Sequence, residues 1–256
     1  MADPTHDARP MIEVKGLQKS FAGNPVLTGI DLAIPQGNTC VILGGSGSGK
    51  TVLMKHMIGL LKPDAGEVFV DGEDIVPMDA EQLARLRHKF GMVFQAAALF
   101  DSMNVYENVA FPLREHLTLD EAEVARRVRA KLDLMGLPRA AERRFPADLS
   151  GGMRKRVGLA RAVVMDPKIV LYDEPTTGLD PITTDYVDEM ILAAQAQLGI
   201  TCVVISHDIA SAFNIADQIA FLSKGVILEQ GPPEQVRASE HPTVKVFLQT
   251  WFGKND

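Results

Sequence analysis

One glycine-rich segment limits what this chain can fold into more than any other part of the sequence. Residues 44–51 read Gly-Gly-Ser-Gly-Ser-Gly-Lys-Thr and match the pattern G-x-x-x-x-G-K-[ST]. Glycines let successive backbone N–H groups converge on phosphate oxygens, and the N-terminus of a following helix adds partial positive charge. An apolar β-rich run over 39–43 precedes the segment, and apolar residues at helical spacing over 51–61 follow it. This order predicts a phosphate-binding loop between a strand and a helix.

The residue types inside this phosphate loop indicate which phosphate ligand it takes. Lys50 is expected to neutralise β- and γ-phosphates, and the Thr51 hydroxyl is expected to bind Mg²⁺. A dinucleotide fingerprint is excluded, because Lys50 occupies the position that would hold the third glycine after Gly45 and Gly47. The backbone contacts are expected from the whole loop, namely Gly44, Gly45, Ser46, Gly47, Ser48, Gly49, Lys50 and Thr51.

Two adjacent carboxylates, Asp173 and Glu174, follow a second apolar run over 168–172. At the edge of a parallel sheet, beside a phosphate loop, Asp173 is expected to hold Mg²⁺ through its water shell. Glu174 is placed to orient or deprotonate an attacking water. Without the phosphate loop, such a pair would more often be the start of a surface loop.

A second possible phosphate cradle is Ser150-Gly151-Gly152 at the start of a predicted helix over 153–164. Its side chain and N–H groups could bind another phosphate, although the same residues also fit an ordinary helix N-cap. Folding both cradles of one chain onto one ligand is awkward. The simpler arrangement is a head-to-tail dimer in which each cradle serves the nucleotide of its partner.

Strands and helices alternate along most of the chain. Strand-like segments lie at 12–17, 26–34, 39–43, 67–70, 168–172 and 200–205, with a hairpin at 218–228, and helical segments lie at 180–198 and 208–216. This order predicts an α/β fold with a mainly parallel sheet and an antiparallel β subdomain. The middle section is helical, with a helix over 118–136. We expect a tail at 1–11, an α/β core at 12–95 and 166–232, a helical subdomain at 96–165 and an extension at 233–256.

Charge and apolar content restrict the partners. The formal net charge is −7, and a nucleic-acid binder would be expected to show a basic excess, so no nucleic-acid partner is expected. No stretch approaches the roughly 18 apolar residues of a membrane span, and the start of the chain has no secretory core. The two cysteines, Cys40 and Cys202, each lie in an apolar run and read as buried core residues. A cytosolic location is expected.

Several short segments, taken in order, resemble one family. The phosphate loop, Gln95, Leu149-Ser150-Gly151-Gly152, Asp173-Glu174, Gly178-Leu179-Asp180 and Ser206-His207-Asp208 follow the order found in ABC-type nucleotide-binding cassettes of the P-loop NTPases. The resemblance covers residues 12–232. It implies an ATPase that binds ATP and Mg²⁺ and works as a homodimer.

The resemblance also implies individual roles. Phe21 is expected to stack on adenine, Gln95 to reach Mg²⁺ and the attacking water, and His207 to contact the γ-phosphate and Glu174. Asp180 is expected to help couple two nucleotide sites. Taken singly, Phe21 would fit a core aromatic and Gln95 a surface polar residue. The family usually has glutamine where this chain has Met153, which removes one polar side chain near the partner's nucleotide.

A narrower resemblance comes from segments 98–102 and 107–116 together with Met153. They are similar to the cytoplasmic ATPases of Mla-type (MCE-associated) phospholipid transport systems of bacterial envelopes. This implies a peripheral location on the cytoplasmic side of the inner membrane, an integral permease, an MCE lipid-binding protein and phospholipid cargo. The segment 93–114 would receive the permease, and the apolar tail over 244–252 would pack on the second cassette.

Other functions remain open at this stage. One is an ABC ATPase for a different substrate, or a soluble one acting on DNA or on Fe–S cluster assembly. DNA repair would require a long coiled-coil insertion and a basic surface, and neither is present. A P-loop kinase would give Ser150-Gly151-Gly152 no role. A non-catalytic binding module would leave Glu174 and His207 without one.

Overall fold

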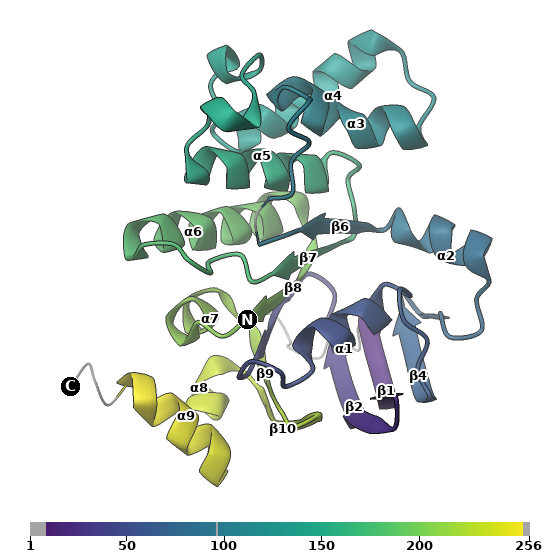
Figure 1. Ribbon diagram of the computed structural model, residues 1–256, viewed down its shortest axis with the longest axis vertical. Coiled ribbons are helices and arrows are strands. Elements are labelled where there is room, and N and C mark those ends of the chain that lie inside the picture. Colours follow the sequence, from purple (N-terminus) through teal and green to yellow (C-terminus); the bar gives the residue numbers. More distant parts are fainter. Residues whose placement is uncertain (1–8, 96, 253–256) are drawn as a thin grey trace, which may run out of the picture.

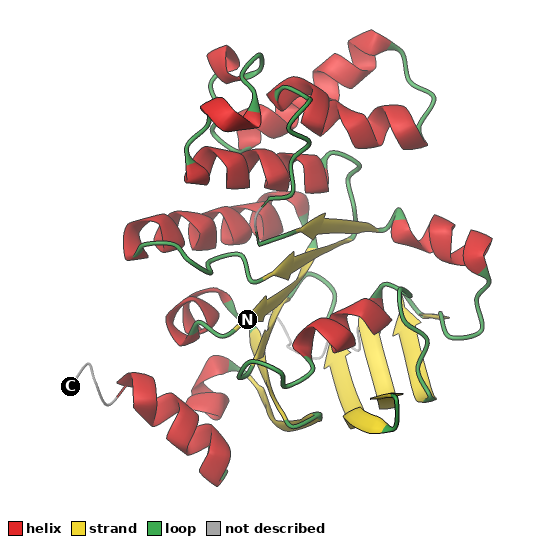
Figure 2. Ribbon diagram, viewed as in Figure 1, coloured by secondary structure: helices red, strands yellow, loops and turns green. Residues whose placement is uncertain are grey.

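The computed structural model describes residues 9–95 and 97–252, and a six-stranded sheet forms their centre (Figure 1, Figure 2). Its strand order is β10-β9-β3-β8-β7-β6. All neighbouring pairs are parallel except β10 with β9. The bounds are β3 Thr39–Leu43, β6 Phe90–Val93, β7 Ile169–Asp173, β8 Thr201–Ser206, β9 Gln218–Ser223 and β10 Val226–Gly231. The predicted α/β fold with a mainly parallel sheet is therefore confirmed.

Both faces of this sheet are buried, and alternate residues of each strand enter different cores. In β3, Val41 and Leu43 join a core that includes residues of the helical section over 105–164. Cys40 and Ile42 join a second core, around α1 (Lys50–Met57). This period of two is what a strand dictates. Cys202 in β8 is also buried, as predicted, and burial raises the pKa of both thiols to about 12.

A smaller antiparallel sheet has the strand order β2-β1-β4-β5 (Figure 1). Residues of this sheet, of α1 and of the central sheet share one hydrophobic core. Its strands are β1 Ile12–Phe21, β2 Asn24–Ile34, β4 Ala65–Val70 and β5 Glu73–Asp74, and α1 runs over Lys50–Met57. The predicted helix over 51–61 is too long: Gly59 has φ +63°, which closes the chain into a turn after Met57. Helix α2, Ala80–Arg87, was not predicted.

Three helices lie together beyond the β6 edge of the central sheet, at the top of Figure 1. They are α3 Val105–His116, α4 Glu121–Leu134 and α5 Gly151–Val163, joined by 3₁₀ turns at Arg139–Ala141 and Pro146–Asp148. The side chain of Asn104 caps α3, that of Asp120 caps α4 and that of Ser150 caps α5. Because Ser150 is the cap, α5 begins at Gly151, two residues before the predicted start.

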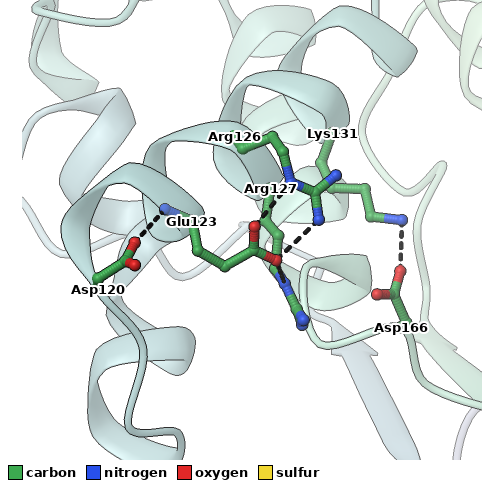
Figure 3. Close-up of polar contacts among 6 residues, drawn as sticks. All are labelled: Asp120, Glu123, Arg126, Arg127, Lys131 and Asp166. Carbon is green, nitrogen blue, oxygen red and sulfur yellow. Dashed lines mark hydrogen bonds and ion pairs between the residues drawn. The ribbon is translucent and has the colours of Figure 1, made fainter.

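Several charged side chains of α4 form ion pairs (Figure 3). Glu123 accepts from Arg126 and Arg127, with N–O distances of 2.7 Å. Lys131 pairs with Asp166 at 2.6 Å, which links α4 to the turn after α5. Exposed pairs of this kind contribute little stability individually. Of these pairs, only Lys131–Asp166 connects α4 to another part of the chain.

The remaining helices are α6 Pro181–Leu198, α7 Ile209–Ile215, α8 Pro233–Arg237 and α9 Pro242–Phe252. Val244 and Leu248 of α9 are buried in the core of their own chain, so these two residues are not available to pack on a second cassette. The predicted tail at 1–11 lies mostly outside the described residues. Within the described part, Met11 is buried, and its amide donates to Ile34 O at 2.8 Å.

Candidate functional site

The phosphate loop follows β3 directly and is shaped by its glycines. A Cβ at Gly44 would lie 2.2 Å from Leu222 O of β9, so only glycine fits there. Gly49 combines a φ of +106° with a close approach to Leu27, so a side chain is excluded twice. The Ser48 hydroxyl is buried and has no hydrogen-bond partner. A buried orphan hydroxyl in a curled loop indicates a place for an oxygen-rich ligand.

Lys50 is held inside this loop. Its Nζ donates to Gly44 O at 2.8 Å and to Gly45 O at 3.1 Å, and it lies 3.8 Å from Glu174 Oε1. Burial lowers the pKa of Lys50, and the carboxylates of Glu174 and Asp173 oppose that shift. The ammonium thus donates hydrogen bonds to carbonyl oxygens of the loop, and a bound phosphate could replace them as acceptors.

The carboxyl end of β7 meets the loop that follows β8. Glu174 Oε2 lies 2.7 Å from His207 Nδ1 and accepts a hydrogen bond from Thr177 Oγ1 at 3.0 Å. Glu174 has φ +51°, a conformation that costs a non-glycine residue about 1–2 kcal/mol. Such strain is retained where the side chain must point in one direction. Burial, and then the charge of Glu174, raises the pKa of neighbouring Asp173.

A pocket of about 740 Å³ opens over these residues. Of the predicted site residues, it is lined by seven of the phosphate loop and by Gln95, Glu174 and His207. Four residues without a predicted role also line it, namely Val26, Val52, Thr177 and Phe247. The structure therefore brings together segments that lie more than 150 residues apart. Gly44, Phe21, Asp173, Asp180 and the serine-glycine segment do not line it.

Phe21 lies at the end of β1, outside this pocket. It is 42% exposed, so it is not a core aromatic, and Lys19 Nζ lies 5.6 Å from its ring centroid. Lys19 is itself held by Asp64 Oδ1 at 2.7 Å and Lys62 O at 2.9 Å. The ring is available to a ligand, but a cation already lies over it.

Ser150, Gly151 and Gly152 lie at the start of α5 and do not reach the pocket of their own chain. Ser150 Oγ accepts from Met153 N at 3.3 Å, which is the N-cap predicted as one alternative. A Cβ at Gly151 or Gly152 would meet nothing within 4 Å. Neither glycine is required by packing inside the chain.

Of the two remaining predicted residues, Gln95 lines the pocket and Asp180 does not. Gln95 is exposed at the pocket and precedes Ala97 and Ala98, which have φ +60° and +45°. Arg161 of α5 holds that bend by donating to both of these alanine carbonyls, at 2.8 and 2.9 Å. Asp180 caps α6, and its hydrogen bonds from Thr183 lower its pKa.

The chain resembles known proteins over most of its length. The sequence profile of the ABC transporter family matches residues 27–177. The "Probable ribonucleotide transport ATP-binding protein mkl" of Mycobacterium leprae (strain TN) is 45% identical over 93% of this chain, which spans about two thirds (68%) of that relative. The "Intermembrane phospholipid transport system ATP-binding protein MlaF" of Escherichia coli (strain K12) is 38% identical over 93% of this chain and 88% of the relative.

Two solved structures have the same fold. CbiO1 of Clostridium perfringens, described as part of the ABC transporter complex cbiONQ, has a TM-score of 0.85 and 31% identity, covering 96% of this chain and 97% of that one. A dimer of the ATP-binding cassette MJ0796 in a post-hydrolysis state bound to ADP and Pi has a TM-score of 0.78 and 30% identity, covering 87% of this chain and 99% of that one.

Proposed function

This chain belongs to the ABC transporter family, and from that premise we propose that it powers phospholipid transport in a bacterial envelope. It is an ABC ATPase, and a solved relative holds the products of hydrolysis. The observation that supports the lipid cargo is the likeness to a relative named for intermembrane phospholipid transport, over 93% of this chain. The mycobacterial relative named for ribonucleotide transport favours ribonucleotides as the second candidate cargo.

The proposed working unit is a head-to-tail homodimer. Lys50, Thr51 and Asp173 of one subunit bind ATP, and Ser150, Gly151 and Gly152 of the other subunit cap it. Two features support this division. The serine-glycine segment does not reach the pocket of its own chain, and both glycines face open space. A solved relative with the same fold is a dimer. In this scheme residues 96–165 act as the helical subdomain that offers the cap.

The donor atoms fit Mg²⁺. Thr51 offers a hydroxyl, Gln95 an amide oxygen and Asp173 a carboxylate, and Mg²⁺ prefers such oxygen ligands together with water and phosphate. When bound, the ion neutralises negative charge that develops on the phosphate oxygens. Charge on Asp173 is costly before the ion arrives, because the side chain is partly buried beside Glu174.

Hydrolysis then requires a water held in line with the γ-phosphate. In our proposal Glu174 accepts a proton from that water as its oxygen attacks phosphorus, and the bond between the γ-phosphorus and the bridging oxygen breaks to give ADP and phosphate. His207 holds the Glu174 side chain in place through the 2.7 Å contact and contacts the γ-phosphate. Lys50 leaves the carbonyl oxygens of Gly44 and Gly45 for the phosphates.

The permease is proposed to dock in a groove of about 640 Å³ beside Gln95. Phe94, Phe100 and Phe111 line it, and the last two rings lie 4.9 Å apart. Arg161 also lines it and holds the bend after Gln95, so a segment in this groove touches the support of a predicted catalytic residue. Among the described residues no helix has the length and apolar character needed to cross a bilayer. The pore would thus come from that partner, and this chain would lie at the cytoplasmic face of the inner membrane.

Affinity purification of the tagged chain from solubilised bacterial membranes tests the proposal. We expect an integral membrane protein, an MCE protein and bound phospholipid to copurify. Phe100→Asp should abolish that capture and leave ATP binding by the isolated chain intact. Phe145→Asp is the matched control, because Phe145 is equally exposed but lies outside the groove. Capture of soluble Fe–S assembly proteins alone would contradict a transport role, and ribonucleotide in place of lipid would favour the second cargo.

A further inference from the structure

The last helix of the chain returns to the nucleotide pocket. Phe247 of α9 lines the same pocket as the phosphate loop, Glu174 and His207. This residue lies 70 positions beyond the end of the family match at residue 177. None of the roles assigned above accounts for an aromatic side chain at this position.

The position of Phe247 follows from the sheet beneath it. Its ring packs edge-on against Phe221 of β9, with centroids 4.9 Å apart. Phe221 is paired in register with Leu43, the residue that precedes Gly44. The next β9 residue, Leu222, abuts Gly44 through its carbonyl oxygen. Phe247 therefore stands beside the start of the phosphate loop, whereas Val26, which borders Gly49, stands beside its end.

Helix α9 is anchored well enough to hold this ring in place. Val244 is fully buried and Leu248 is 4% exposed, and both belong to the core under the central sheet. Phe247 lies between these two anchors in sequence and is partly buried against the same core. Val246 points the other way and is 61% exposed. The helix thus has one face on the core, with Phe247 at the border between that face and the pocket.

We propose that Phe247 is a nucleotide-binding residue that α9 supplies to the pocket of its own chain, and that α9 docking and ATP binding strengthen each other. The inference rests on the proposed function of the pocket as the ATP site. An apolar ring in the wall of this pocket keeps water from the phosphate loop. Contacts between phosphate oxygens and the loop N–H groups are stronger where water is excluded. Coupling between the two events is reciprocal by thermodynamic linkage.

The first measurement is ATP affinity of the full chain in the presence of EDTA, which prevents hydrolysis. Phe247→Ala is expected to weaken binding by about tenfold, equivalent to roughly 1.4 kcal/mol. Phe247→Leu should recover most of the affinity, because it restores an apolar side chain. Val246→Ala is the matched control on the same helix and should bind as the unsubstituted chain does.

The second measurement separates a nucleotide contact from simple packing. Hydrogen exchange of the amides over 243–249 is followed with and without ATP. ATP is expected to slow exchange in α9 of the unsubstituted chain, and a purely structural Phe247 would not produce this effect. Leu248→Ala, which loosens α9 from the core side, should also weaken ATP binding.

Two results would overturn the inference: Phe247→Ala binding ATP within about twofold of the unsubstituted chain, or exchange in α9 that ATP does not change. Either would leave the proposed function standing. By contrast, an unsubstituted chain that binds no ATP would remove the proposed function and this inference together. The two failures are therefore distinguishable in one set of titrations.

Discussion

The phosphate loop and the serine-glycine segment are both glycine-rich helix starts, but only the first lies against predicted catalytic side chains of its own chain. Around the loop, Lys50 contacts two carbonyl oxygens and lies near Glu174, which in turn contacts His207. Ser150 is exposed, and its side chain and carbonyl oxygen accept hydrogen bonds only from the helix that it caps, among the contacts of the described residues. The phosphate loop thus already lies beside Glu174 in the single chain, and we call it the assembled region. The serine-glycine segment does not line the pocket of its own chain.

Packing within the chain requires glycine in the phosphate loop but not in the serine-glycine segment. A side chain at Gly44 would collide with the β9 backbone of the same chain. At Gly151 and Gly152 a side chain would meet nothing in the chain, and neither has a positive φ. Packing and backbone strain therefore explain glycine at 44 and leave it unexplained at 151 and 152. In the proposed dimer, these two glycines would leave room for the nucleotide of the partner subunit.

The largest effect should come from the assembled region. Glu174→Gln is expected to reduce ATP hydrolysis by about 10²–10⁴-fold, because the amide cannot accept the proton of the attacking water. ATP binding should persist, since Lys50 and the loop are untouched, and the closed dimer should accumulate. Phosphate release and size-exclusion chromatography with ATP measure the two outcomes.

Thr177→Val serves as the control for this substitution. It removes one hydrogen bond to Glu174 Oε2 but leaves the carboxylate and the His207 contact in place. Its rate should fall far less than that of Glu174→Gln. Turnover close to that of the unsubstituted chain in Glu174→Gln would refute the assignment of Glu174 as the base.

A mixing experiment tests directly whether the two regions meet across subunits. Lys50→Ala disables the loop, and Ser150→Asp keeps a good N-cap while placing a negative charge against phosphate. Each variant alone should be inactive. Random mixing in equal amounts should restore about one quarter of the pockets, because half of the dimers are mixed and each has one intact pocket. Steady-state ATPase activity of the mixture measures the recovery.

The control is a mixture of Lys50→Ala with Lys50→Ala,Ser150→Asp, in which no pocket can be intact. Recovery there would indicate contamination and not complementation. If the first mixture stays inactive while the unsubstituted chain hydrolyses ATP as a monomer, the shared pocket is wrong. The comparison between the two regions would then lose its functional meaning.

Much of the assembled region could be predicted from sequence because its chemistry is local. The order strand, glycine loop, helix fixes where Lys50 lies, and a carboxylate pair after a parallel strand must reach the same sheet edge. Helix α2 was missed, although Asp79 and Gln82 form a capping box that its sequence spacing could have revealed. The end of α1 was misplaced because Gly59 breaks a periodicity that apolar spacing alone continues to Leu61.

The positions of the aromatic residues could not be predicted in this way. Phe21 was assigned by resemblance, yet in the structure it is exposed beside Lys19 and does not line the pocket. Phe247 does line the pocket, whereas its apolar helix was expected to pack on a second cassette. Which surface an amphipathic helix covers depends on long-range packing, here between Phe247 and Phe221, and no local spacing encodes that partner.

Alanine substitutions at Gly44 and Gly151 should have different effects on stability, and both effects should be smaller than that of Glu174→Gln. Gly44→Ala should lower the free energy of unfolding by about 1–3 kcal/mol, because the new methyl group forces β9 away from the loop. Gly151→Ala should leave thermal stability unchanged or slightly higher, since alanine favours the helix. It should still reduce ATPase activity by about tenfold, because the methyl group would occupy space meant for the partner's nucleotide. Equal losses of stability in both variants would contradict the distinction.

The smallest effect concerns pH and contrasts Asp173 with Asp180. The pKa of Asp173 is raised by burial and by Glu174, against the opposing charges of Lys55 and Lys50, so this carboxyl becomes neutral at a higher pH than an ordinary aspartate. Protonated Asp173 therefore adds to the free energy of unfolding of the free chain at low pH. This contribution is lost as pH rises through the raised pKa. A protonated carboxyl cannot hold Mg²⁺, so Mg²⁺ should raise the unfolding temperature of the ATP-bound chain less as pH falls. Asp173→Asn should remove this pH dependence.

Asp180 supplies the control, because hydrogen bonds from Thr183 lower its pKa and keep it charged over the same range. Asp180→Asn should therefore leave the pH dependence of the Mg²⁺ effect as it is in the unsubstituted chain. Thermal unfolding with ATP, at several Mg²⁺ concentrations between about pH 5.5 and about pH 7.5, should show apparent Mg²⁺ affinity falling by at most about tenfold per pH unit. The same curve in Asp173→Asn as in the unsubstituted chain would place the metal elsewhere. It would also mean that the assembled region is completed by a carboxylate other than the one buried at the end of β7.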